Sequence, residues 1–357
     1  MEDAARPRNR PSLRRRRLDY GRAARQLPLP RLAGRAYRSR SDHRGGPAAG
    51  HLRPACLHLQ HHLRGRTADQ RPRRAGECFH GSAHHRCFHG STPDRRRPHV
   101  TTPTILTICT AAGSSGKSTI ADALAALEAE RGQRVLFIDA DPQSDGTLVL
   151  GVEPHPDQPG IGHVLTGRAT LAEATVDTAS GVQLVPANPA MSETLAEFSQ
   201  RRGADMRLRQ VLTDTAPEVD LIVIDCPGDA TARITIAAVC AADHVISTTF
   251  AAGKESKGLV EVEDLVTEFA GLYGLAVRFS AVVPCAVQPP SRNNSAQSHL
   301  ANIREAFGEL VTPTVRWSEL VLNAYDARQP VPVFAPSAAV TRDLRAVRDD
   351  LIAKGVL

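Results

Sequence analysis

A run of small residues that ends in a lysine and two hydroxyl residues is the first feature of this sequence that could do chemistry. The run reads Ala111-Ala112-Gly113-Ser114-Ser115-Gly116-Lys117-Ser118-Thr119. An apolar stretch precedes it and an amphipathic stretch follows it, so the pattern predicts a strand, a loop and a helix. Backbone N–H groups and the helix N-terminus converge on phosphates in such a loop. We expect residues 113–119 to bind ATP, with Lys117 on the β- and γ-phosphates and the Ser118 hydroxyl on Mg²⁺.

Carboxylates follow two further apolar stretches. Residues 135–138 lead into Asp139-Ala140-Asp141, and residues 221–224 lead into Asp225. The carboxyl ends of parallel strands beside a phosphate-binding loop are where ligands bind in such sheets. We expect Asp225 to hold Mg²⁺ through water, on the opposite side from Ser118. Capping of the next helix is the alternative role for an aspartate at a strand end.

Apolar strands and amphipathic helices alternate from residue 104 to the end of the chain. This alternation predicts an α/β fold, a doubly wound and mostly parallel sheet. The expected strands are 105–109, 135–138, 221–224, 245–250 and 277–283. Apolar residues at Val340, Leu344, Val347 and Leu351 predict a final helix that docks on the sheet. A membrane-targeting helix would carry a bulkier apolar face and more Lys and Arg, so we expect no membrane binding.

Composition separates a head, residues 1–103, from the domain at residues 104–357. Residues 1–100 contain 24 Arg, no Lys, 10 of the 14 His and seven acidic residues, against 20 basic and 31 acidic residues in the rest. The net charges are therefore about +17 for the head and about −11 for the rest. Few aliphatic residues and no periodic apolar pattern predict that the head is disordered.

Three alternatives remain open for this head. An arginine-rich arm such as Arg14-Arg15-Arg16-Arg17 would attract phosphates without sequence preference. The near-repeat Cys78-Phe79-His80 and Cys87-Phe88-His89 offers metal ligands, although its cysteines are nine residues apart rather than in a CxxC pair. The composition is also typical of a GC-rich reading frame translated upstream of the true start, which would then be Val100.

Cysteine usage and hydropathy indicate the compartment. The seven cysteines lack regular pairing, which argues against a secreted disulfide framework. No apolar run reaches the roughly 18 residues that a membrane span needs. We therefore expect a soluble, cytoplasmic protein.

The motifs together resemble those of the ParA/Soj family of DNA-segregation ATPases, within the ParA/MinD superfamily. Besides the phosphate-binding loop, the resemblance rests on Asp139-Ala140-Asp141-Pro142-Gln143, Asp225-Cys226-Pro227-Gly228, Pro313-Thr314-Val315-Arg316-Trp317-Ser318-Glu319 and Pro330-Val331. It implies an ATPase that depends on ATP and Mg²⁺ and dimerises around nucleotide. It also implies nonspecific DNA binding in the ATP state, association with the nucleoid and a ParB-like centromere-binding partner that stimulates hydrolysis.

The resemblance also implies roles for individual residues. Asp141 matches the aspartate that orients the attacking water, and Asp139 is its neighbour near the metal. Pro284 and Arg316 belong to segments that frame the adenine base. Family members bind DNA through scattered basic residues without base readout. The candidates here are Arg278, Arg292, Arg304 and Arg316.

Two departures from the family pattern bear on the rate of hydrolysis. The signature lysine, which crosses the dimer interface to the partner's nucleotide, is replaced by Ala112. Loss of a cation that acts in trans costs about a thousandfold or more in rate, so we expect slow hydrolysis. Lys254 or Lys257 could supply the missing charge. Asp145 replaces the usual asparagine and adds a carboxylate near the γ-phosphate or at the surface.

Two other classes of function fit the same residues. A regulatory or adaptor protein would bind ATP and hydrolyse it negligibly, as the loss at Ala112 suggests. A small-molecule kinase or ligase would share the phosphate-binding loop, but no substrate-binding signature is present. The cargo of a partition ATPase, whether plasmid, chromosome or protein cluster, is not encoded in these motifs.

Overall fold

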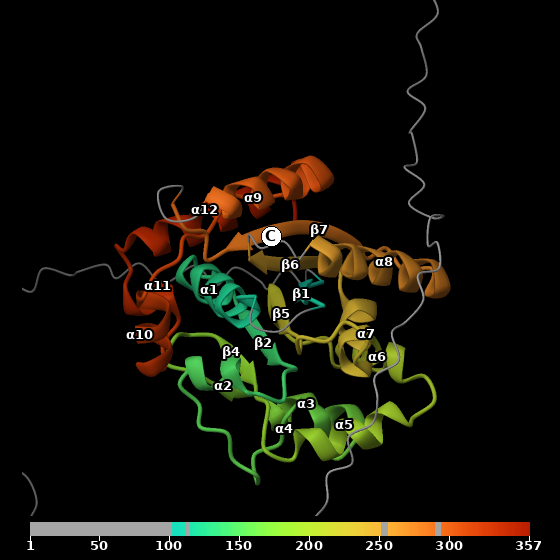
Figure 1. Ribbon diagram of the computed structural model, residues 1–357. Helices are drawn as coiled ribbons and strands as arrows, with labels where there is room; N and C mark the ends of the chain where they lie inside the picture. The colour runs from blue at the N-terminus through green and yellow to red at the C-terminus, as the bar shows by residue number, and fades with distance from the viewer. Residues whose placement is uncertain (1–101, 112–114, 251–255, 290–293) are drawn as a thin grey trace, which may run out of the picture. The chain divides into compact units, whose positions relative to one another are not determined.

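A seven-stranded sheet forms the centre of the part of the chain that the structure describes (Figure 1). The computed structural model describes residues 102–111, 115–250, 256–289 and 294–357, so residues 1–101 of the predicted head lie outside the described residues. The strand order is β3-β4-β2-β5-β1-β6-β7. Every neighbouring pair is parallel except β3 with β4, which confirms the predicted doubly wound α/β class.

The strands coincide with the apolar runs. They are β1 (Thr104–Ile108), β2 (Val135–Asp139), β3 (Val176–Asp177), β4 (Gln183–Val185), β5 (Leu221–Asp225), β6 (His244–Phe250) and β7 (Arg278–Cys285). Every residue of β2 and β5 is buried, as expected for central parallel strands that are covered on both faces. The five predicted strands have the expected places, with ends shifted by one or two residues. The short strands β3 and β4 were not predicted.

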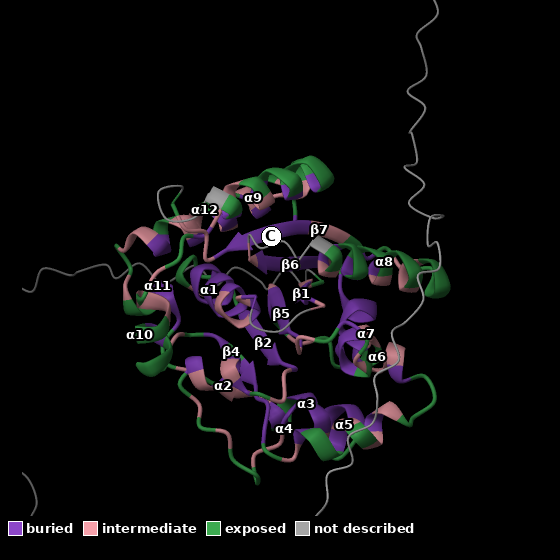
Figure 2. Ribbon diagram, in the orientation of Figure 1, coloured by how far each residue is buried: buried purple, intermediate pink, exposed green. Residues whose placement is uncertain are grey.

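Helices cover both faces of the sheet (Figures 1 and 2). They are α1 (Lys117–Glu130), α2 (Asp145–Val149), α3 (Ile161–Thr166), α4 (Leu171–Ala174), α5 (Met191–Ser199), α6 (Ala204–Thr215), α7 (Arg233–Ala241), α8 (Ser256–Tyr273), α9 (Asn294–Phe307), α10 (Leu320–Asp326), α11 (Val331–Phe334) and α12 (Ala339–Ala353), with a 3-10 turn at Gly308–Leu310. Successive strand side chains alternate between the two faces. Leu136 and Ile138 of β2 therefore pack with α3 and α5 to α8, whereas Val135 and Phe137 pack with α1 and α10 to α12.

The register of the central strands places two acidic residues side by side. In β2 and β5, Asp139 is the partner of Asp225, and in β1 and β5, Ile108 is the partner of Asp225. All three residues end their strands, and the chain leaves β1 directly into the phosphate-binding loop. The sheet therefore brings the loop and both carboxylates to one edge, as the sequence predicted.

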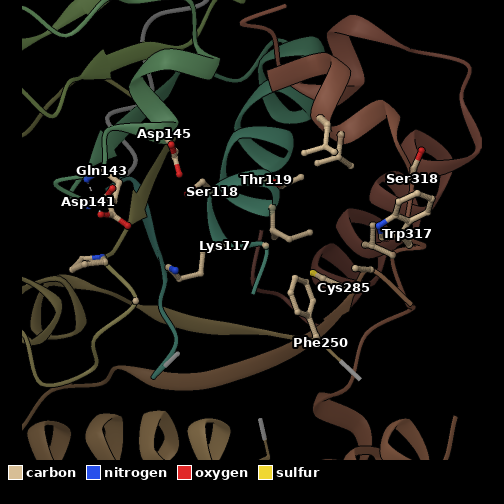
Figure 3. A pocket seen from close by; sticks show the side chains of 18 of the residues that line it. Lys117, Ser118, Thr119, Asp141, Gln143, Asp145, Phe250, Cys285, Trp317 and Ser318 are labelled. Atoms are coloured by element: carbon tan, nitrogen blue, oxygen red, sulfur yellow. Dashed lines mark hydrogen bonds between the residues drawn. The ribbon is translucent and has the colours of Figure 1, made fainter. Parts of the chain in front are cut away.

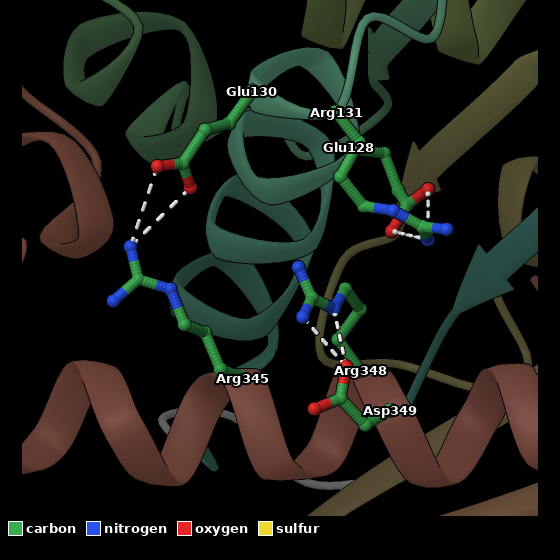
Figure 4. Close-up of polar contacts among 6 residues, drawn as sticks. All are labelled: Glu128, Glu130, Arg131, Arg345, Arg348 and Asp349. Atoms are coloured by element: carbon green, nitrogen blue, oxygen red, sulfur yellow. Dashed lines mark hydrogen bonds and ion pairs between the residues drawn. The ribbon is translucent and has the colours of Figure 1, made fainter.

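The C-terminal helix α12 packs beside α1 on one face of the sheet. Its predicted stripe of Val340, Leu344, Val347 and Leu351 is fully buried in the same core as α1, and each such side chain contributes about 1.5–3 kcal/mol. Polar contacts flank this core (Figure 4). Arg345 of α12 forms an ion pair of 3.3 Å with Glu130 at the end of α1. None of the described helices is long and apolar enough to cross a bilayer.

Candidate functional site

A cavity of about 820 Å³ opens at the edge of the sheet where β1, β2 and β5 end. Its lining comes from the start of α1, the loop after β2, the loop after β5, and the segment from β7 to α10. One end is polar, with Lys117, Ser118 and Asp141, and the other end carries Phe250 and Trp317 (Figure 3). The volume and the polarity gradient suit a ligand with a charged tail and an apolar ring.

The phosphate-binding loop turns sharply into α1 at Gly116. Gly116 has a left-handed backbone with φ of 88°, and a Cβ there would meet the Cβ and Sγ atoms of Cys285 at 3.3 Å. Both constraints favour glycine. The buried Ser115 hydroxyl lies 3.3 Å from Thr110 and 3.1 Å from Thr248, so Ser115 anchors the loop to the sheet and does not line the cavity. Residues 112–114, with the predicted ligands Gly113 and Ser114, lie outside the described residues.

Lys117, Ser118 and Thr119 form the first turn of α1 and line the cavity. The Lys117 side chain is largely buried, with 6% of its surface exposed. Burial raises the pKa of the carboxyl groups of Asp141 and Asp225, and the Lys117 ammonium offsets part of this increase by Coulomb attraction. The helix N-terminus adds partial positive charge at the same place. This end of the cavity is therefore built to receive an anion.

Asp225 is completely buried below the first turn of α1. Neither of its carboxylate oxygens has a hydrogen-bond partner of good geometry among the described residues. Burial and the charge of Asp139 raise its pKa well above the usual value, while the Ser118 hydroxyl and Lys117 lower it. Buried carboxylates of this kind pair with a cation or bind a metal. The residues present therefore fit Mg²⁺ between Ser118 and Asp225.

Asp139 has a different environment, although it neighbours Asp225. Its Oδ2 atom accepts bonds from the Thr147 amide at 2.7 Å and the Thr147 hydroxyl at 2.6 Å, and its Oδ1 atom accepts the Asp141 amide at 3.1 Å. Burial raises the pKa of Asp139 to about 7, and these bonds lower it in part. The carboxylate thereby fixes both the loop after β2 and the start of α2. A direct metal contact stays a prediction.

Asp141 points into the cavity from the loop after β2 (Figure 3). Its Oδ1 atom accepts a hydrogen bond of 3.0 Å from the Gln143 amide, which fixes the side chain. Partial burial raises the pKa of Asp141, and Lys117 lowers it. A half-buried carboxylate with raised basicity is suited to receive a hydrogen bond from water.

The two residues predicted to frame the base are placed differently from each other. Pro284 lies in β7, accepts the Val315 amide at 2.8 Å through its carbonyl and does not line the cavity. Its neighbours Cys285 and Ala286 line it instead. Arg316 lines the cavity, but Asp343 of α12 accepts from its Nε at 2.6 Å and from its Nη2 at 2.9 Å. The guanidinium is therefore already paired.

Sequence reasoning missed three features of the site. Phe250 and Trp317 form the aromatic end of the cavity, and the only signal for them was the position of Trp317 within the late segment. Asp122 of α1 is buried, although it is a charged residue with no sequence feature that predicts its burial. Asp145 is hydrogen-bonded to Tyr325, a contact between segments that no local pattern reveals.

Comparison with known proteins agrees with this geometry. A family model described as an AAA domain matches residues 103–270. Soj of Thermus thermophilus, a chromosome-partitioning ATPase, is 29% identical over 68% of this chain and 92% of its own length. The maintenance of carboxysome distribution protein A of Synechococcus elongatus is 28% identical over 62% of this chain and 88% of its own. The solved complex of a Cyanothece McdA variant with ATP superposes with a TM-score of 0.64 at 24% identity, over 70% of this chain and 97% of that chain.

The parallel sheet and the loop that turns into α1 at Gly116 define a P-loop nucleotide-binding domain. Its motifs and relatives support a P-loop ATPase of the ParA/MinD family. The chain is similar to partitioning and positioning ATPases of that family, and the solved structure shows that they share a fold.

Proposed function

We propose that this chain is a Mg²⁺-dependent ATPase that acts in plasmid or chromosome partitioning or in intracellular positioning, and that it hydrolyses ATP slowly. The observation that carries this proposal is the polar end of the cavity. Lys117, Ser118 and Asp141 converge there, above the buried Asp225 carboxylate, whose oxygens have no hydrogen-bond partner of good geometry in the part of the chain that the structure describes. The comparison with Soj supports the partitioning role.

Each residue at this end has a distinct task in phosphoryl transfer to water. Mg²⁺, when bound, would neutralise charge on the phosphate oxygens. The Ser118 hydroxyl and the Asp225 carboxylate would hold it, and Asp139 would fix the loop that carries Asp141. Lys117 and the start of α1 would hold the phosphate charge. Asp141 would orient the attacking water by accepting its hydrogen bond.

The other end of the cavity would hold the adenine base. Phe250 and Trp317 present aromatic rings there, and Cys285 and Val315 complete an apolar wall. Stacking and apolar contact favour a flat base over a second charged group. The backbone of Ala286 would then supply a polar contact, since the Arg316 amide already donates to Asp343 at 3.1 Å.

Nonspecific DNA binding, an ATP-dependent homodimer and a ParB-like partner are further parts of the proposal. Of the predicted DNA contacts, Arg278 and Arg304 are exposed and lack an ion-pair partner among the described residues. Arg316 is paired with Asp343, and Arg292 lies outside the described residues. Arg278 and Arg304 are therefore the candidates to substitute first.

A nucleotide-binding adaptor with negligible hydrolysis is the second candidate function. The observation in its favour is Ala112 at the place of the family's signature lysine. Such a protein would keep every ATP contact described above. It would lack the cation that stabilises charge in the transition state.

Steady-state ATP hydrolysis by the full chain, with and without duplex DNA, tests the proposal. Turnover that DNA stimulates and that Lys117→Ala abolishes would support a partition ATPase. Tight ATP binding without turnover under either condition would favour the adaptor. A third outcome is turnover that DNA does not change, together with no binding to DNA in a pull-down with ATP. This outcome would favour a small-molecule kinase or ligase.

A further inference from the structure

A second, smaller cavity lies beyond Ser118 and Thr119, between α1, α2, α10 and α11. Its volume is about 150 Å³, which leaves room for an ion and several waters. Asp122 and Asp145 bring two carboxylates to its lining, and the remaining polar residues there are neutral. Val321, Leu322 and Ala324 of α10 form an apolar wall opposite α1. The α10 side of the cavity is open to bulk water, since Leu322 and Tyr325 are 65% and 40% exposed, whereas Asp122 lies on the buried α1 side.

Asp122 is a buried residue of this lining that lacks a hydrogen-bond partner for one carboxylate oxygen among the described residues. It lies one helical turn after Ser118, and only 3% of its surface is exposed. Its Oδ1 atom is buried and has no hydrogen-bond partner within the described residues. Burial and the nearby charge of Asp225 both raise the pKa of its carboxyl. A carboxylate so buried is normally paired with a cation or with a metal.

Asp145 supplies a second carboxylate to the same cavity. The Tyr325 hydroxyl donates to its Oδ1 atom at 2.9 Å, and this bond holds the side chain in place. Its Oδ2 atom accepts no hydrogen bond in the described part of the chain and is available to a ligand. Two carboxylates on α1 and α2 thus line a space that the hydroxyl residues Ser118 and Thr119 also border.

We propose that this cavity binds a hydrated divalent cation of the Mg²⁺ or Mn²⁺ class between Asp122 and Asp145. The site is separate from the metal position at Asp225. No group of three His, Cys, Asp or Glu side chains among the described residues is arranged to hold a metal. Mg²⁺ does not require such a cage, because it keeps several waters and binds proteins through one or two carboxylates. Neutral oxygens of the lining would bind the coordinated waters.

The cation would add positive charge one turn away from the phosphate-binding end of α1. Three further carboxylates lie in this region, at Asp139, Asp141 and Asp225, and Lys117 acts on Asp141 and Asp225. A bound divalent ion would offset part of this excess. The site does not depend on ATP hydrolysis, so it can be tested without nucleotide.

Mn²⁺ titration of the nucleotide-free full chain, followed by electron paramagnetic resonance of the free ion, tests the proposal. We expect two classes of Mn²⁺ site in the wild-type chain. Asp122→Asn should weaken one class by about tenfold or more, and Asp225→Asn should weaken the other. Asp326→Asn, a change of an exposed aspartate on α10, is the matched control and should leave both classes unchanged.

Two outcomes would overturn the proposal. One is Mn²⁺ binding by Asp122→Asn that equals binding by the wild type, because Asp122 is then a buried protonated carboxyl. The other is a single class of site in the wild-type chain that only Asp225→Asn removes. If Asp122→Asn does not fold, as circular dichroism would reveal, the half-buried Asp145→Asn decides by the same criterion. Neither outcome depends on ATPase activity. Failure of this cation site can therefore be distinguished from failure of the proposed ATPase function.

Discussion

The hydroxyl of Tyr325 donates a hydrogen bond of 2.9 Å to Asp145, which lies 180 residues earlier in the chain. This bond raises the pKa of the Tyr325 phenol. It joins the start of α2, just after the loop of Asp141, to α10, which borders the aromatic end of the cavity. The segments that would hold phosphate and base are therefore tied to each other, although they enter the cavity from opposite sides.

Tyr325→Phe should weaken both stability and ATP binding. The variant loses one partly exposed hydrogen bond, so we expect a decrease of about 1 kcal/mol in the free energy of unfolding. The same loss of preorganisation should raise the Kd for ATP by about fivefold. Urea denaturation and ATP titration measure the two effects.

Tyr273→Phe is the matched control for this change. The Tyr273 hydroxyl donates to Asp205 at 2.9 Å, between α8 and α6 and away from the cavity lining. It should lower stability by a similar amount and leave ATP affinity unchanged. Equal loss of affinity in both variants would show that the effect reflects general destabilisation.

Asp141→Ala should separate ATP binding from hydrolysis. Its side chain is placed by the Gln143 amide at 3.0 Å and faces the polar end of the cavity. Removal of a group that orients water should lower kcat by about 100-fold or more, with the Kd for ATP changed less than about threefold. Single-turnover hydrolysis and ATP titration test this, with Asp326→Ala as surface control. A large loss of affinity with unchanged kcat would assign Asp141 to nucleotide binding instead.

The fold and the polar end of the site could be predicted from the sequence, because both depend on local patterns. A buried parallel strand is a short apolar run, and its last residue faces the ligand edge, so Asp139 and Asp225 were found by position alone. The short strands β3 and β4 carry no such run and pair as a sheet edge, so their existence depends on tertiary packing.

The base end and the partners of charged side chains could not be predicted, since they depend on contacts between distant segments. Arg316 was expected at the base, yet its guanidinium is held by Asp343, 27 residues later. Pro284 was expected in the lining, but side chains alternate along β7, so Cys285 lines the cavity in its place, and Ala286 follows from the turn after the strand. Asp122 carries no sequence signal of burial, and it is buried where α1 faces α10 and α11.

Ala112→Lys should accelerate hydrolysis if the chain forms the family's dimer. The substitution restores a cation at the position from which the family contacts the partner's nucleotide. Such cations contribute about a thousandfold or more in favourable cases, and we expect an increase in kcat of at least about tenfold. Ala112→Met controls for side-chain size without charge. Equal rates in the lysine and methionine variants, in chains that dimerise with ATP, would contradict the prediction.

Asp139→Asn should change the pH dependence of stability. Burial raises the pKa of Asp139 to about 7 in the folded chain, against an ordinary value of 3.8. Between these two values the unfolded carboxyl has lost its proton and the folded one retains it. The folded state then binds more protons, so stability falls as pH rises from about 4 to about 7. The full effect is on the order of 4 kcal/mol, since each unit corresponds to about 1.4 kcal/mol.

Urea denaturation of the metal-free chain at a series of pH values measures this slope. The asparagine cannot ionise, so its variant should show a shallower decrease across the same window, whatever its absolute stability. The buried carboxyls of Asp122 and Asp225 have raised pKa values as well, so a part of the slope should remain. Asp326→Asn should keep the slope of the wild type. Parallel curves for Asp139→Asn and wild type would mean that Asp139 is ionised in the folded chain throughout, with its three hydrogen bonds outweighing its burial.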